Sequence, residues 1–109
     1  MKSSLATAVT FCLLVSPAFS GEQVDPAIEK GRLLAQSLCA KCHAIGTSGD
    51  SPFEAAPQFR TMAQKWPIDS LAEAFAEGIV VGHPGMPEFK FEPEQIGALL
   101  TYMESVQTE

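Results

Sequence analysis

The sequence is poor in basic residues and in polar aromatic ones. Its 109 residues contain seven Lys and Arg against 13 Asp and Glu, with two His, one Trp and one Tyr, and the net charge is −6. Because a surface of this sign repels phosphate backbones and anionic lipids, we expect no nucleic-acid partner. The acidic excess suits encounters with basic proteins, or it serves only solubility.

Cysteine is also scarce, and long apolar runs are absent. The cysteines are Cys12, Cys39 and Cys42, too few for an iron–sulfur cluster, which takes four cysteine ligands. The apolar stretch at residues 5–15 is shorter than the roughly 20 residues that a membrane-spanning helix needs. Neither strand-like alternation nor an internal repeat is present, so sheet and repeat architectures are not expected.

The first 20 residues resemble an export signal. Lys2 precedes the apolar stretch, and Ala18-Phe19-Ser20 places small residues at the spacing that a signal peptidase recognises. We expect residues 1–20 to be a signal peptide that is cleaved after Ser20; a retained anchor is the alternative. Cleavage would remove Cys12 and Lys2 and leave residues 21–109 as one domain with a net charge of −7.

Helical signals begin at Asp25-Pro26, which is typical of an N-cap followed by proline at the first helical position. This helix leads to Cys39, and residues 46–56 then indicate a loop. The expected apolar face of the helix comprises Ile28, Gly31, Leu34, Ala35 and Leu38.

Two shorter helices are expected in the middle of the chain. Residues 59–66 have helical spacing up to Pro67, which stops the helix. In the next helix, Ser70 and Glu73 indicate a capping box and Gly78 a C-cap.

The last helix starts near Pro93. Its expected buried residues are Ile96, Leu99, Leu100, Met103 and Val106. The pattern therefore predicts an all-α fold of about four helices. A chain of this size buries a modest core and often depends on a disulfide, metal or cofactor, so we expect another group to fill its middle.

Residues 39–43 form the motif C-x-x-C-H, the attachment signal for c-type haem. Thiols at positions i and i+3 emerge on one side of a helix end, where both can add to the vinyl groups of one haem edge. The following residue, His43, then lies under the ring and can coordinate iron. The motif predicts one covalently attached haem c, held by Cys39 and Cys42.

Two other uses of these residues compete with haem attachment. A thioredoxin-like redox pair also has the form C-x-x-C, but that fold needs a βαβ pattern, which the sequence lacks. A zinc site would need a distant fourth ligand, and His83 is the only other histidine.

Further features occur in a recognisable order along the chain. Gly31 lies eight residues before the first haem cysteine, Pro57 follows the motif, Met86 lies in a Gly/Pro loop, and Leu99 and Tyr102 lie three apart on the last helix. Over residues 25–107 the chain resembles a small bacterial class I c-type cytochrome with a single haem. It departs from mitochondrial members in its shorter middle segment and its acidic surface.

The resemblance implies about four helices wrapped around one covalently bound haem. The N- and C-terminal helices would cross at Gly31, against Leu99 and Tyr102. The carbonyl of Pro57 would accept a hydrogen bond from His43, and Met86 would be the second axial ligand of iron.

The residues themselves also favour Met86 as an iron ligand. Pro84 and Pro87 stiffen its loop and reduce the entropy lost on ordering, whereas the other two methionines of residues 21–109 lie on apolar helix faces. His83 is the rival ligand, or it is a surface residue without a role. Arg60 and Trp66 are candidate donors to the haem propionates, with a solvated arginine and a core tryptophan as the alternatives.

A haem with both axial positions filled by protein suits one-electron transfer and not substrate chemistry. We therefore expect a periplasmic electron carrier, not an enzyme, that meets respiratory or dehydrogenase partners transiently as a monomer, with no stable membrane insertion. The first alternative is a dedicated haem subunit of a periplasmic oxidoreductase complex. The second, which the sequence favours less, is a haem-based sensor.

Overall fold

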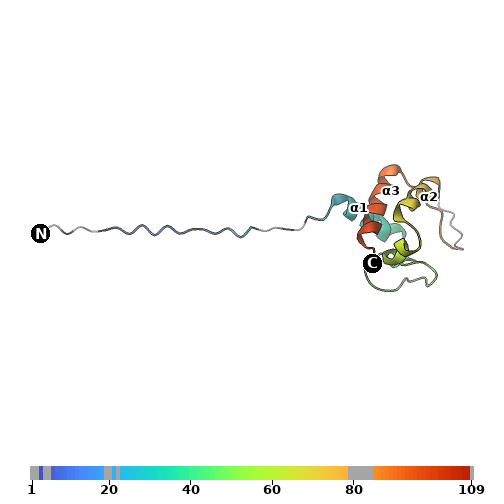
Figure 1. Ribbon diagram of the computed structural model, residues 1–109, viewed down its shortest axis with the longest axis horizontal. Helices are drawn as coiled ribbons and strands as arrows, with labels where there is room; N and C mark the ends of the chain where they lie inside the picture. The colour runs from blue at the N-terminus through green and yellow to red at the C-terminus, as the bar shows by residue number, and fades with distance from the viewer. Residues whose placement is uncertain (1–2, 4–5, 19–20, 22, 79–84, 109) are drawn as a thin grey trace.

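A computed structural model describes residues 3, 6–18, 21, 23–78 and 85–108. These residues form three α-helices, α1 (Pro26–Leu38), α2 (Leu71–Glu77) and α3 (Pro93–Ser105), and two 3-10 helices, η1 (Phe59–Gln64) and η2 (Ile68–Ser70), and no strand occurs among them (Figure 1). The all-α prediction is confirmed. The second expected helix is η1, a 3-10 helix that ends at Gln64, short of Pro67.

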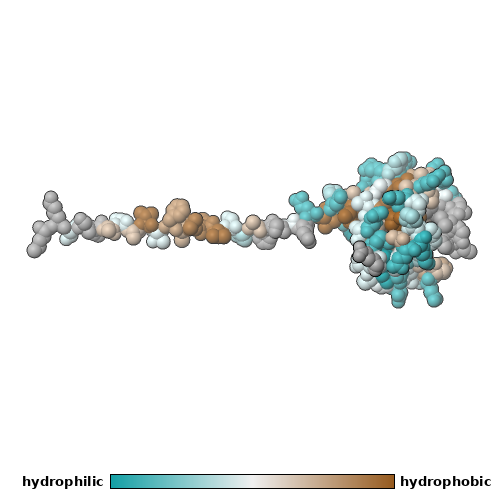
Figure 2. Space-filling view, viewed as in Figure 1, coloured by the Kyte–Doolittle hydropathy of each residue, from teal (hydrophilic) through white to brown (hydrophobic). Residues whose placement is uncertain are grey.

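The N-terminal residues extend away from the helical domain (Figure 1). Apolar side chains on this extension, such as Phe11 and Leu14, are exposed (Figure 2). Within residues 6–18 none is buried, so this stretch contributes nothing to the core. Cleavage after Ser20, a residue outside the described ones, stays a prediction.

The two terminal helices cross at Gly31, as the resemblance implies. A Cβ atom at Gly31 would lie 2.0 Å from the carbonyl oxygen of Ala98 and 2.7 Å from the Cβ of Tyr102. Only glycine permits this approach of α1 to the backbone of α3, since a Cβ at this position would overlap a carbonyl. Leu99, beside this crossing, is fully buried.

The core gathers side chains from all five helices and from the segment before α3. Its buried members are Ala35, Phe59, Met62, Ile68, Phe75, Phe91, Ile96, Leu99, Tyr102, Met103 and Val106. Leu38, expected on the buried face of α1, is instead 39% exposed, and Leu100 is only partly buried.

The helix ends follow local chemistry with one exception. Asp25 caps α1, with its Oδ1 accepting from the Ala27 N–H at 2.8 Å, and Gly78 ends α2 at a φ of 94°. At α3 the backbone N–H of Glu92 donates to the Gln95 side chain at 3.0 Å, which the sequence did not indicate because glutamate is an uncommon N-cap.

The capping box predicted at Ser70 is wrong. Ser70 has helical backbone angles as the last residue of η2, and its hydroxyl donates backward to the Pro67 carbonyl at 2.7 Å. Because η2 runs directly into α2, Ser70 has no capping role there. None of the helices in the described ranges is both long and apolar enough to cross a membrane.

Replacing Gly31 with alanine is expected to destabilise the protein by about 3 kcal/mol or more, because the new methyl group overlaps the Ala98 carbonyl and the helices must separate. Urea unfolding of the purified protein measures this. Gly97→Ala is the matched control, since a Cβ there meets nothing within 4 Å and alanine favours the helix. Equal midpoints for Gly31→Ala and the parent would contradict the close crossing.

Candidate cofactor site

A tight turn after α1 brings the motif residues together. The backbone N–H groups of Cys42 and His43 both donate to the carbonyl of Cys39, at 3.1 and 2.9 Å. This turn keeps both thiols and the imidazole on one side of the chain, and all three residues line one cavity. The sequence prediction that the motif forms a single site is therefore supported by the geometry.

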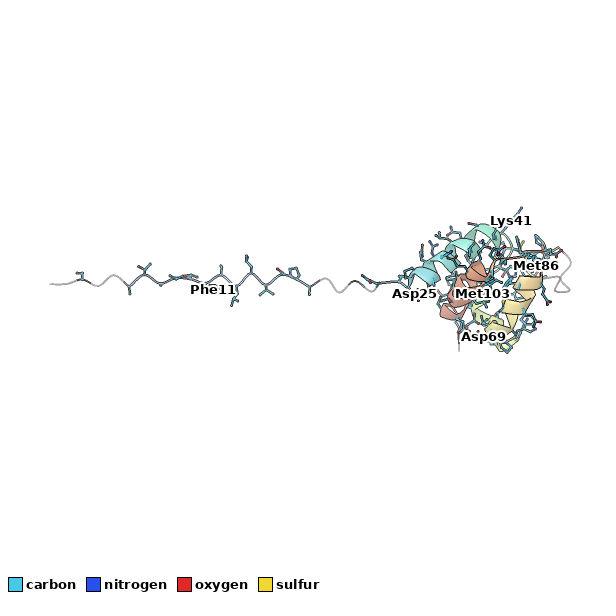
Figure 3. All side chains as sticks on the ribbon, turned by 90° about the horizontal axis from the view of Figure 1, so that it is seen from above. Phe11, Asp25, Lys41, Asp69, Met86 and Met103 are labelled. Atoms are coloured by element: carbon cyan, nitrogen blue, oxygen red, sulfur yellow. The ribbon has the colours of Figure 1, made fainter. Side chains whose placement is uncertain are left out.

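Two cavities adjoin at this site. The first, of about 140 Å³, is lined by the motif and by Met86; the second, of about 230 Å³, extends inward to Met103. Both share Cys39, Met86 and Phe89 as lining residues, so the two apolar cavities adjoin at these side chains. Met103 lies toward the middle of the domain and Met86 at the end away from the N-terminal extension (Figure 3).

Among the described residues, His43 has a polar side chain that is buried, with 9% of its surface exposed. Its Nδ1 lies 2.6 Å from the carbonyl oxygen of Pro57. Because a carbonyl can only accept, Nδ1 carries the hydrogen, and the Nε2 of the neutral ring keeps its lone pair for a metal. The ring of Phe59 packs against the imidazole, with 5.5 Å between centroids.

Cys39 and Cys42 are both free thiols. Burial raises the pKa of the Cys39 thiol to about 11, so it is protonated at neutral pH. A redox-active C-x-x-C pair needs a lowered pKa, so this environment argues against that alternative. The described residues contain no group of three or more His, Cys, Asp or Glu side chains that could hold a metal, and His83 lies outside them.

Met86 lines both cavities and packs against the core. It follows Gly85, whose φ of 99° is in the region that favours glycine. Met62 and Met103 line only the second cavity, so among the described methionines Met86 alone shares a cavity with His43. The rival ligand, His83, lies outside the described residues.

The two candidate propionate donors differ in their placement. Trp66 lines the second cavity and is 38% exposed, so it is not a plain core residue. Arg60 lines neither cavity, and its Nη1 donates to the Gly49 carbonyl at 2.7 Å. Of the pair, Trp66 alone is placed to contact a group in the cavity.

Sequence reasoning missed Phe89, which lines both cavities. Its ring stacks on that of Phe91, with 5.8 Å between centroids, and Phe91 meets Phe75 edge-on at 5.3 Å. The available signal was the pair of phenylalanines two residues apart between two prolines. Such spacing places both rings on the same side of an extended segment.

A family model described as Cytochrome c matches residues 28–107. The chain belongs to the cytochrome c family. The match covers most of the chain, and it confirms the resemblance to class I members with a single haem. No curated protein and no solved structure gives a significant match to this cytochrome.

The residues of this cytochrome fit a haem c on their own chemistry. Two unpaired thiols three residues apart, an imidazole with a free Nε2 and a thioether line one apolar cavity, and a second apolar cavity adjoins it. Members of the family carry electrons on such a group. The structure therefore supports a haem site that is lined by the motif and by Met86.

Proposed function

We propose that this protein is a bacterial periplasmic cytochrome c that carries single electrons between respiratory or dehydrogenase partners. Cys39 and Cys42 hold its one haem covalently, and His43 and Met86 ligate the iron. The observation that supports this best is the joint lining of one apolar cavity by both thiols, His43 and Met86. When bound, the haem supplies reversible one-electron reduction at iron.

The side chains of this site favour transfer over substrate chemistry. The hydrogen bond to Pro57 fixes the tautomer and orientation of His43. It also makes the lone pair of Nε2 a stronger ligand for a metal. Met86, a soft ligand, would stabilise the ferrous state and raise the reduction potential. With His43 and Met86 both holding the iron, no coordination site would be left for a substrate, which suits a carrier and not an enzyme.

The route for electrons lies at the mouth of the first cavity. Leu38 and Phe53 line this cavity and are 39% and 51% exposed. Their exposed surface surrounds the thiols to which one haem edge would be attached. A small apolar patch of this kind suits a brief encounter with a partner.

Haem attachment is tested by the intact mass of the exported protein. We expect the chain from Gly21 to Glu109 plus one haem, and loss of the adduct in the double variant Cys39→Ala/Cys42→Ala. Cys12→Ala is the control, because Cys12 should leave with the signal peptide. A mature protein without tetrapyrrole on the two thiols would refute the proposal.

Met86→Ala is expected to remove the low-spin ferric spectrum and to let the reduced protein bind carbon monoxide, because the thioether that would hold the iron is lost. The reduced-to-oxidised ratio at fixed ambient potential should fall more than tenfold. A tenfold fall corresponds to a decrease of about 59 mV in the reduction potential of a one-electron couple. His83→Ala is the matched test of the rival ligand and should leave spectrum and potential unchanged. The reverse result would assign the iron to His83.

Electron transfer to a basic redox protein should slow as ionic strength rises from about 0.01 to 0.15 M, since the Debye length falls from about 30 to 8 Å. The exposed acidic side chains expected to steer the encounter are Glu73, Glu77, Glu88 and Glu92. Stopped-flow rates measure the effect, with an uncharged reductant as the control. A rate independent of salt would remove charge steering from the proposal.

A further inference from the structure

We propose that Gln107 is a positioning residue for His43, which acts through the segment from Pro57 to Arg60. This inference rests on the proposed role of His43 as an iron ligand. Gln107 lies two residues beyond the end of α3 and lines neither cavity. We nevertheless expect it to influence the reduction potential.

The amide of Gln107 makes three hydrogen bonds. Its Nε2 donates to the carbonyls of Phe59 at 2.6 Å and Met103 at 2.7 Å, and its Oε1 accepts from the N–H of Ala63 at 2.8 Å. Two carbonyls require the NH₂ group and an N–H requires the oxygen, so the partners fix the orientation of the amide. One side chain thus joins the last turn of α3 to both ends of η1.

The next residue strengthens the same connection. The backbone N–H and the hydroxyl of Thr108 both donate to the Arg60 carbonyl, at 2.8 and 3.0 Å. The carbonyls of Phe59 and Arg60, at the start of η1, are therefore both held by the residues that follow α3.

The other side of this segment faces the haem motif. The Phe59 N–H donates to the carbonyl of Ala44 at 2.9 Å, and the Pro57 carbonyl accepts from His43 at 2.6 Å. The Phe59 ring also packs on the imidazole. Residues 57–60 are consequently fixed between His43 on one side and the end of α3 on the other.

This arrangement ties the electronic character of His43 to Gln107. A short Nδ1–H···O bond gives the imidazole more negative character and stabilises ferric iron. If Gln107 no longer holds the Phe59 carbonyl, the segment can relax and the bond to Pro57 lengthens. The imidazole then becomes a weaker donor, and the ferrous state gains relative to the ferric one.

The test uses full-length, haem-loaded protein with Gln107→Met, which keeps the side-chain length and removes all three hydrogen bonds. At fixed ambient potential the reduced-to-oxidised ratio should rise about threefold, less than for loss of a group that contacts the ligand directly. The Nδ1–H resonance of His43 in the reduced protein should shift upfield and exchange faster with solvent.

Gln36→Met is the matched control. Gln36 is exposed on α1, and its Oε1 accepts from the Arg32 side chain at 2.8 Å. The same chemical change there removes a side-chain hydrogen bond far along the chain from Pro57 and should alter neither the ratio nor the resonance.

A second variant separates donor from acceptor. Gln107→Glu keeps an oxygen for the Ala63 N–H but sets a carboxylate against the carbonyls of Phe59 and Met103. It should move the resonance in the same direction as Gln107→Met. Because its added negative charge itself favours the ferric state, the resonance is the readout for this variant, and it serves as the test if the methionine variant does not accumulate with haem.

The outcomes distinguish this inference from the proposed function. If the parent protein lacks attached haem or His43 ligation, the proposed function fails first. If the parent is intact and both variants show a lower melting temperature but an unchanged resonance, with an unchanged ratio in Gln107→Met, Gln107 is only structural and the inference is overturned.

Discussion

The hydrogen bond between His43 and the Pro57 carbonyl is the interaction on which the site depends. It joins the haem motif to the segment that opens η1, and it decides which imidazole nitrogen is free. Since His43 is enclosed, this bond also satisfies a polar group whose burial would otherwise be costly. The cavity, the motif turn and the start of η1 therefore form a single unit.

Helix α3 and the residues that follow it support this unit from two points. The hydroxyl of Tyr102 donates to the Ile45 carbonyl at 2.9 Å, two residues after His43, and Gln107 holds the carbonyl of Phe59, whose ring packs against the imidazole. The same Tyr102 packs on Gly31 at the crossing with α1. One helix thus fixes the position of α1, which leads into the motif, and of the residues that follow it.

From the residues alone, most of the features that could be predicted have local causes. The two distant contacts that were predicted, Gly31 with Tyr102 and His43 with Pro57, came from the family resemblance. Asp25 caps α1 because its partner lies two residues away, and the motif is contiguous, so both were visible in the sequence. The partners of Gln107 lie as far as 48 residues away, and nothing local marks them. The pattern at Ser70 suggested a capping box, but the preceding 3-10 turn had already taken up its hydroxyl.

The enclosed thiol at the end of α1 has a consequence for the order of assembly. With its pKa near 11, Cys39 offers almost no thiolate at neutral pH once the chain has folded. Cys39 also packs against the core. A haem would therefore reach this sulfur more readily while the polypeptide is still open than after the helices have closed.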